Sequence, residues 1–128
     1  FVNTNRVLVV DVNYRINLFG FLAVMDLAWS TDSGASTTGN FGLLDAQEAL
    51  RWVQQNIHSF GGNPDKVTVF GESSGGTLVL MLLASPRSKG LFHRAMANSG
   101  SPNITVDLAT ASEVSAAGNL TADGQMGV

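Results

Sequence analysis

The sequence lacks cysteine and carries few charges, and both absences narrow the classes of protein to which it can belong. Without cysteine, no disulfide framework can form within these 128 residues. The seven lysines and arginines form no cluster, which argues against a nucleic-acid partner. The formal net charge of −3 is too small to indicate a charged partner of any other kind.

Long hydrophobic runs are also missing. No apolar stretch approaches the roughly 18–20 residues that a membrane-spanning helix needs, and the longest one, residues 78–84, is better explained as a buried helix. The chain opens at Phe1 with neither an initiating methionine nor the charged segment of a signal peptide. What the sequence does contain is apolar material, 45% of residues against 13% charged, which is typical of the buried centre of an α/β sheet.

Three strand-like segments alternate with two helical patterns. Residues 7–14 are β-branched and nearly continuously apolar, which predicts a strand buried on both faces. Residues 67–70 and 94–98 predict two further strands. One helix is expected to start after its cap at Asn40 and to stop at Gly61-Gly62, and another to run from Ser74 to Ser85-Pro86. The first helix has an apolar stripe made of Leu43, Ala46, Leu50, Val53, Ile57 and Phe60.

This order of elements predicts two βαβ units and therefore an α/β fold with a mostly parallel sheet and right-handed crossovers. Residues 15–25 are expected to form a connection around Phe19-Gly20-Phe21, and residues 30–39 a surface loop. Asn63-Pro64-Asp65 is typical of a turn. The tail, residues 106–128, is rich in Ala, Ser and Gly; its composition permits a helix within residues 108–117 and disorder at its end.

The segment Gly71-Glu72-Ser73-Ser74-Gly75 matches the GxSxG nucleophile elbow, and it lies between an expected strand and an expected helix. A serine hydroxyl that attacks an ester needs a base and must stand clear of the fold on a sharp turn. We expect glycine at Gly71 and Gly75 because side chains there would clash with the neighbouring strand and helix. The N–H of Ser74, at the helix start, is the expected oxyanion-hole donor. The bare pattern occurs often by chance, so the strand–helix context carries the interpretation. Ser74 as nucleophile is the weaker alternative, because Glu72 stands where its elbow glycine would be.

From residue 7 to residue 103 the sequence resembles the cholinesterase-like type-B carboxylesterase family. The resemblance implies a partial α/β-hydrolase fold, Ser73 as nucleophile and Glu72 beside it in the active site. Ser99 resembles a serine that supports the triad from behind, although it also fits an ordinary strand end. Arg15 and Asp45 resemble a structural ion pair. The motifs that carry the resemblance are Asn13-Tyr14-Arg15, Phe19-Gly20-Phe21-Leu22, Gly39-Asn40-Phe41-Gly42-Leu43-Leu44-Asp45, Ala49-Leu50-Arg51-Trp52-Val53-Gln54-Gln55-Asn56-Ile57, Phe60-Gly61-Gly62-Asn63-Pro64, Gly71-Glu72-Ser73-Ser74-Gly75-Gly76 and Asn98-Ser99-Gly100-Ser101-Pro102.

The resemblance also implies that parts of the catalytic site lie elsewhere. In the family, a glycine-rich oxyanion loop precedes the first residue of this chain, and the triad acid and histidine follow its last. The sequence is therefore interpreted as an internal fragment, residues 1–128, of a much larger hydrolase domain, whose remaining chain would be its partner. In the family a strand separates residues 7–14 from residues 67–70. Because this chain lacks that strand, we expect the fragment alone to expose an apolar face and to be neither stable nor active.

The two histidines, two Asn-X-Thr sequons and two tryptophans each have a structural as well as a functional explanation. His58 and His93 are interpreted as non-catalytic, because the triad histidine of the family follows the serine at a long distance. Asn103 and Asn119 each begin an Asn-X-Thr sequon. Short sequons arise by chance, but the resemblance to a largely secretory-pathway family favours glycosylation and an extracellular or secretory location. Trp29 and Trp52 are expected to be packing residues.

Two functions remain open at this point. The first is a serine hydrolase that cleaves small-molecule or lipid carboxylic esters through an acyl-enzyme and needs no metal or organic cofactor. The second is a non-catalytic adhesion or scaffold protein on the same fold. Such relatives usually lose the elbow serine, so the retention of Ser73 with both glycines favours the enzyme.

Overall fold

The computed structural model describes residues 7–23, 29–30, 36–37 and 39–102. The chain divides into two compact units, one formed by Phe1–Asn13 with Ala46–Ser101 and the other by Tyr14–Asp45 with Pro102–Val128. The predictions for the tail and for the sequons at Asn103 and Asn119 fall outside the described residues.

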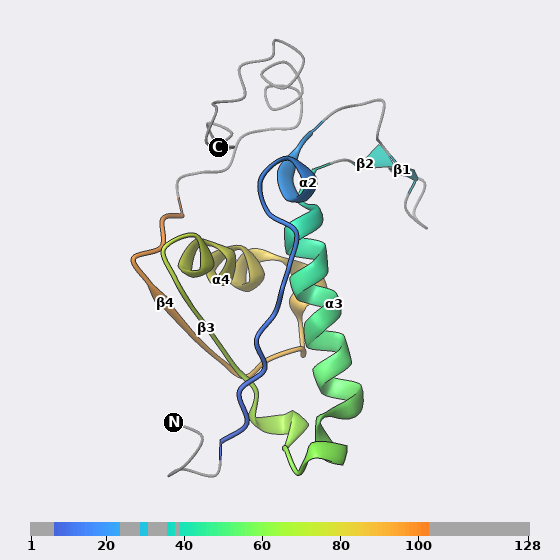
Figure 1. Ribbon diagram of the computed structural model, residues 1–128, viewed down its shortest axis with the longest axis vertical. Helices are drawn as coiled ribbons and strands as arrows, with labels where there is room; N and C mark the ends of the chain where they lie inside the picture. Colours follow the sequence, from blue (N-terminus) through green and yellow to red (C-terminus); the bar gives the residue numbers. More distant parts are fainter. Residues whose placement is uncertain (1–6, 24–28, 31–35, 38, 103–128) are drawn as a thin grey trace. The chain divides into compact units, whose positions relative to one another are not determined.

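The first unit contains a parallel βαβ arrangement. Strand β3 (Thr68–Glu72) pairs in parallel with β4 (Arg94–Asn98), with Thr68 opposite Arg94 and Glu72 opposite Asn98. Helix α4 (Ser74–Ala84) connects them and packs against both strands (Figure 1). The predicted α/β class and parallel sheet are confirmed here, although β3 extends two residues past the predicted end at Phe70.

Helix α4 buries Leu78, Val79 and Leu82, as its apolar sequence predicts. Leu83 is 56% exposed, so the described residues do not cover this helix all round. The helix ends at the predicted Ser85, whose N–H donates to the Met81 carbonyl at 3.0 Å. Proline cannot continue the helix in the same register, and a short 3₁₀ turn, η4 (Pro86–Ser88), follows.

Helix α3 (Phe41–Asn56) continues into the 3₁₀ turn η2 (Ile57–Phe60) and stops at Gly61, which has a φ of 81°. Ala46, Val53 and Ile57 of the predicted stripe are buried. The prediction for Phe60 is wrong, since its side chain is 61% exposed. A 3₁₀ turn has about three residues per turn rather than 3.6, which rotates Phe60 off the stripe. Its ring lies 5.7 Å from that of Trp52, which is itself 45% exposed.

The predicted turn at Asn63-Pro64-Asp65 is present as η3 (Pro64–Lys66). The side chain of Asn63 caps it by accepting a hydrogen bond from the Asp65 N–H at 2.8 Å. Across the described ranges, no helix has both the length and the apolar character needed to cross a membrane.

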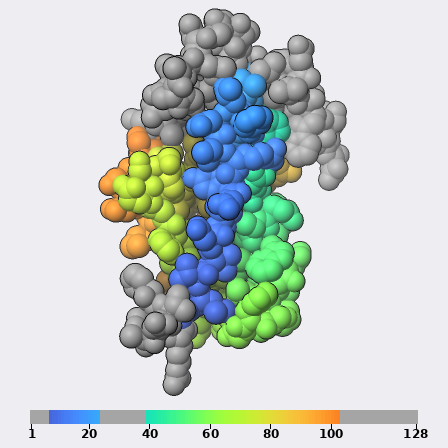
Figure 2. Space-filling model, in the orientation of Figure 1, coloured from blue at the N-terminus to red at the C-terminus, as the bar shows by residue number. Residues whose placement is uncertain are grey.

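Residues 7–14 do not form the predicted strand. Val7, Leu8, Val9 and Val10 are between 43% and 50% exposed, and Figure 2 shows this dark-blue segment at the surface. A strand needs a neighbour to pair its N–H and C=O groups, and none of the described strands pairs with this segment. The exposed apolar residues agree with the expectation that the isolated chain leaves an apolar face uncovered.

The second unit contains a helix that the sequence pattern did not predict. Helix α2 (Asn17–Phe21) replaces part of the expected connection, and its five residues are too few to show a helical period. Gly20 is buried, and glycine is required there because a Cβ would collide with the carbonyl oxygen of Arg15. A Cβ at Gly42, in the first turn of α3, would collide with the same oxygen and would lie 2.7 Å from the ring of Phe21.

The expected surface loop at residues 30–39 also contains regular structure. Strands β1 (Trp29–Ser30) and β2 (Ser36–Thr37) pair antiparallel, Trp29 with Thr37 and Ser30 with Ser36. Two-residue strands leave no alternation in the sequence, so this pairing could not be predicted from pattern. The side chains of these four residues lie outside the described part of the structure.

Candidate active site

Ser73 lies at the junction of β3 and α4 with an unusual backbone conformation. Its φ is 54° and its ψ is −118°, while its side chain is exposed. A positive φ is uncommon for a residue with a Cβ; it costs about 1–3 kcal/mol and persists only where the surrounding structure enforces it. The sharp turn leaves the serine at the edge where the strand ends and the helix begins.

Both backbone polar groups of Ser73 are hydrogen-bonded. Its N–H donates to the carbonyl oxygen of Asn98, the last residue of β4, at 2.9 Å. Its carbonyl oxygen accepts from the N–H of Thr77 in α4 at 3.0 Å. The neighbouring strand and the following helix therefore hold the two peptide groups that define the conformation of Ser73.

The glycines around Ser73 meet different surroundings. A Cβ at Gly71 would collide with the backbone of Gly75, as expected for an elbow. The clash expected at Gly75 does not occur, since no described atom lies within 4 Å of a Cβ built there. A Cβ at Gly76 would instead lie 2.5 Å from the carbonyl oxygen of Asn98 and 3.1 Å from Cα of Gly100. The second position at which a side chain would clash is therefore Gly76 and not Gly75, because Gly76 faces the end of β4.

Ser74 is the first residue of α4, and its side chain is exposed. The first amides of an α-helix have no partner within the helix, and the helix dipole favours negative charge at this end. The Ser74 N–H is one of these first amides.

Glu72 and Ser99 lie at the same sheet edge as Ser73. Glu72 is the last residue of β3 and pairs in register with Asn98, and Ser99 follows β4 directly. Both side chains are exposed, and Ser99 has a φ of 53°. The carboxyl ends of parallel strands are where α/β folds place their binding sites. Three residues predicted for the site therefore meet at one edge.

Neither histidine of the chain lies at this edge. His93 precedes β4, and its Nδ1 accepts a hydrogen bond from the Val67 N–H at 3.3 Å. From Thr68 to Glu72 the strand spans roughly 13 Å at about 3.3 Å per residue, which separates His93 from Ser73. His58 lies in η2, is exposed, and has its Nε2 3.4 Å from the Ser59 hydroxyl. The described residues thus bring no imidazole to Ser73.

The sequence pattern assigned no role at the site to four residues around Ser73: Asn98 and Thr77, which bond Ser73; Gly100, which packs against Gly76; and Ser101, whose N–H donates to the Thr77 hydroxyl oxygen at 3.1 Å. For Thr77 the sequence held one signal, because it is a polar residue directly before a run of apolar helix positions. The structure buries it.

In the second unit, the predicted ion pair between Arg15 and Asp45 is present. The guanidinium Nε and Nη2 of Arg15 donate to the two carboxylate oxygens at 2.7 Å each, and the Arg15 N–H adds a bond of 3.0 Å. These hydrogen bonds lower the pKa of Asp45 and raise that of Arg15. The guanidinium carbon also lies 5.3 Å from the ring centroid of Phe41. The pair links the segment before α2 to the start of α3.

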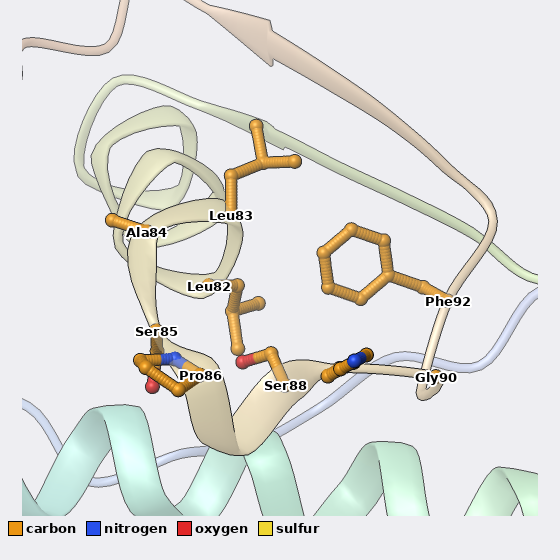
Figure 3. A pocket seen from close by; sticks show the side chains of 9 residues that line it. Leu82, Leu83, Ala84, Ser85, Pro86, Ser88, Gly90 and Phe92 are labelled. Atoms are coloured by element: carbon orange, nitrogen blue, oxygen red, sulfur yellow. The ribbon is translucent and has the colours of Figure 1, made fainter.

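A pocket of about 320 Å³ lies at the other end of α4 from Ser73 (Figure 3). Leu82, Leu83 and Phe92 line it together with η4. Ser85 and Ser88 also line it, and their hydroxyl oxygens accept from Nε2 of the buried Gln47 at 2.9 and 3.0 Å. This pocket contains no residue predicted for the site. No group of three or more acidic, histidine or cysteine side chains that could hold a metal occurs in the part of the chain described.

Most of the chain is similar in sequence to known esterases. Residues 1–123 match the model of the carboxylesterase family. Over 95 residues the chain is 53% identical to human cocaine esterase, covering 74% of the chain and 16% of that protein. It is 50% identical over 101 residues to acetylcholinesterase of Electrophorus electricus, covering 79% and 15%. It is 47% identical over 112 residues to fumonisin B1 esterase of Sphingopyxis macrogoltabida, covering 88% and 20%.

Solved esterase structures are also similar to this chain. A thermophilic PNB esterase superposes with a TM-score of 0.70 at 45% identity, covering 82% of this chain and 20% of that one. The chain thus spans between 15% and 20% of the length of these relatives. The parallel sheet, the family match and the likeness to solved structures show that this chain belongs to the carboxylesterase family and carries part of its α/β-hydrolase fold.

Proposed function

We propose that this protein hydrolyses carboxylic esters through an acyl-enzyme in which Ser73 is the nucleophile. The observation that carries the proposal is the exposed Ser73 with its positive φ between β3 and α4, in a chain that belongs to the carboxylesterase family. The substrate class is a small-molecule or lipid ester, and no metal or organic cofactor enters the reaction.

In the proposed reaction, Oγ of Ser73 forms a bond to the acyl carbon of the ester while a base takes the serine proton. The oxyanion accepts a hydrogen bond from the Ser74 N–H. The carbon–oxygen bond to the alcohol then breaks, and the alcohol leaves with the proton from the base. Water repeats the sequence and releases the acid. The base and the glycine-rich part of the oxyanion hole come from the remainder of the hydrolase chain.

Glu72 and Ser99 have supporting roles in this proposal. Glu72 lies beside the reacting ester as the residue before the nucleophile, at the end of β3. Ser99 supports the triad from behind, where the backbone turns after β4. Their position at the sheet edge that holds Ser73 favours both roles.

The experiment compares Ser73→Ala with Ser74→Ala in the full-length natural chain, using a chromogenic p-nitrophenyl ester. Ser73→Ala should lower kcat by roughly 10³–10⁶-fold, because the covalent step is lost. Ser74→Ala keeps the backbone N–H that would donate to the oxyanion, so kcat should stay within about tenfold of the wild type. Removal of the donor itself would lower kcat by about 100-fold or more. Turnover by Ser73→Ala at the wild-type rate would overturn the proposal. A folded wild-type protein without turnover would favour the adhesion or scaffold function.

We further propose an extracellular or secretory-pathway location, on the basis of the sequons at Asn103 and Asn119. Glycosidase treatment of native material should lower its mass. An unchanged mass, with both peptides detected in unmodified form, would contradict glycosylation of this chain.

A further inference from the structure

We propose that Thr77 is a positioning residue for the ester hydrolysis proposed above, fixing the angle of Ser73 by tying α4 to the segment after β4. The inference rests on that proposed function. It concerns a closed set of four residues, Ser73, Thr77, Asn98 and Ser101, which we call the elbow clamp.

The elbow clamp restrains Ser73 from both sides. Asn98 holds the Ser73 N–H at 2.9 Å, and Thr77 holds the Ser73 carbonyl at 3.0 Å. These two peptide groups determine the φ of 54° and ψ of −118°. Both bonds join backbone groups, so a displacement of β4 relative to the first turn of α4 would rotate the Cα–Cβ bond of Ser73 and move its hydroxyl.

Thr77 has a second bond that closes the set. Its side-chain oxygen accepts from the Ser101 N–H at 3.1 Å, and its side chain is buried. The same residue therefore bonds Ser73 through its N–H and the segment after β4 through its hydroxyl. Because Asn98 and Ser101 belong to one short stretch of chain, movement of α4 relative to β4 would strain the Ser73–Asn98 and Thr77–Ser101 bonds together.

Contact between Gly100 and the backbone of Gly76 and Thr77 brings the segment after β4 close to the first turn of α4. A Cβ at Gly100 would lie 2.6 Å from the Thr77 nitrogen and 2.8 Å from the Gly76 carbonyl oxygen, so the backbones touch without side chains between them. The positive φ of Ser99 turns the chain so that Gly100 and Ser101 reach the first turn of α4. At such short range, a hydrogen bond of one side chain can set the helix position.

The test uses Thr77→Ala and Thr77→Ser in the full-length natural chain, two variants that differ by one oxygen atom. Thr77→Val, which keeps the volume and removes the acceptor, is a second probe. Thr68→Val is the matched control, because Thr68 is exposed at the opposite end of β3. The readout is the burst rate of p-nitrophenyl ester acylation, normalised to the fraction of sites titrated by a fluorophosphonate.

Thr77→Ala should acylate about 10–100-fold more slowly per titrated site than Thr77→Ser, since displacements near 1 Å can cost about 10²-fold. The dissociation constant of the ester before acylation should change less than about threefold, because substrate binding does not depend on the hydrogen bonds of the elbow clamp. Thr68→Val should acylate at the wild-type rate. A role confined to stability would lower the melting temperature and the titrated fraction but not this normalised rate.

Equal normalised rates for Thr77→Ala and Thr77→Ser would overturn the inference, because the hydroxyl would then have no part in positioning. If Thr77→Val does not fold, the Ala–Ser comparison still decides. A wild-type protein with neither burst nor fluorophosphonate labelling would overturn the proposed function and this inference with it. Labelling of the wild type combined with equal Ala and Ser rates would overturn the inference alone.

Discussion

Strand β4 is paired although its sequence is not typical of a strand, whereas residues 7–14 have a strand-like sequence and form no strand. Residues 7–14 are rich in valine and leucine, whereas β4 reads Arg-Ala-Met-Ala-Asn and leaves all five side chains exposed. Yet β4 is paired along its whole length, and residues 7–14 form no strand. The difference lies in the partner: α4 returns the chain to pair β4 with β3. Strand preference mostly reflects packing against neighbours, so an apolar run without a neighbour stays unpaired.

The largest effect expected from this comparison concerns residues 1–128 expressed alone. Their exposed apolar segment has no pairing strand among the described residues, and Phe70 and Met96, which pair in register, are 63% and 60% exposed. We expect no cooperative thermal transition by calorimetry and no ester turnover. A cooperative melt together with measurable turnover would show that the piece is self-sufficient.

A second test compares two adjacent glycines of α4 in the full-length chain. Gly76→Ala places a methyl group 2.5 Å from the Asn98 carbonyl, so the elbow must shift, and turnover should fall by about 100-fold. Gly75→Ala meets open space among the described residues and should cost less than about tenfold. Kinetics on a p-nitrophenyl ester, with a melting curve for each variant, measure both effects. Equal losses would mean that the contact with β4 does not decide the geometry.

The smallest effect is expected for the ion pair of the second unit. Hydrogen bonds from Arg15 lower the pKa of Asp45 in the folded state, so this carboxylate stabilises the fold above its unfolded pKa of about 3.9. The stabilisation should disappear as the pH falls through the lowered folded value. Asp45→Asn should therefore lower the Tm of the full-length chain by about 1–3 °C at pH 7. The Tm difference should shrink as the pH is lowered below about 3.9, and a difference that stays constant as the carboxylate is titrated would contradict the assignment.

The strand–turn–helix arrangement at Ser73 could be predicted from sequence because its signals are local: a β-branched run, a serine between glycines, and the start of an apolar helix. The ends of β4 and α4 followed from similar local signals, such as Ser85-Pro86. The choice between Gly75 and Gly76 could not be predicted, because it depends on which glycine faces the Asn98 carbonyl across the turn. The role of Thr77 could not be predicted for the same reason, because its hydrogen-bond partner Ser101 lies 24 residues further along the chain.

The other misses share a physical cause. Helix α2 and the β1–β2 pair are shorter than one period of any pattern. Phe60 continues the spacing of the α3 stripe, but the change to 3₁₀ geometry at Ile57 turns it outward. Residues 7–14 carry the right pattern for a strand and lack a described partner. Pattern therefore predicts what a segment prefers, and its neighbours decide what it forms.

The assignment of Ser73 as the nucleophile can be checked by mapping the site at which a covalent inhibitor attaches. The full-length natural chain is treated with a fluorophosphonate, digested, and analysed by mass spectrometry of the peptide that spans Lys66 to Arg87. We expect one phosphonyl adduct on Ser73 and none on Ser74, with hydrolysis lost in proportion to labelling. An adduct on another residue that tracks loss of activity, or full activity with Ser73 modified, would contradict it.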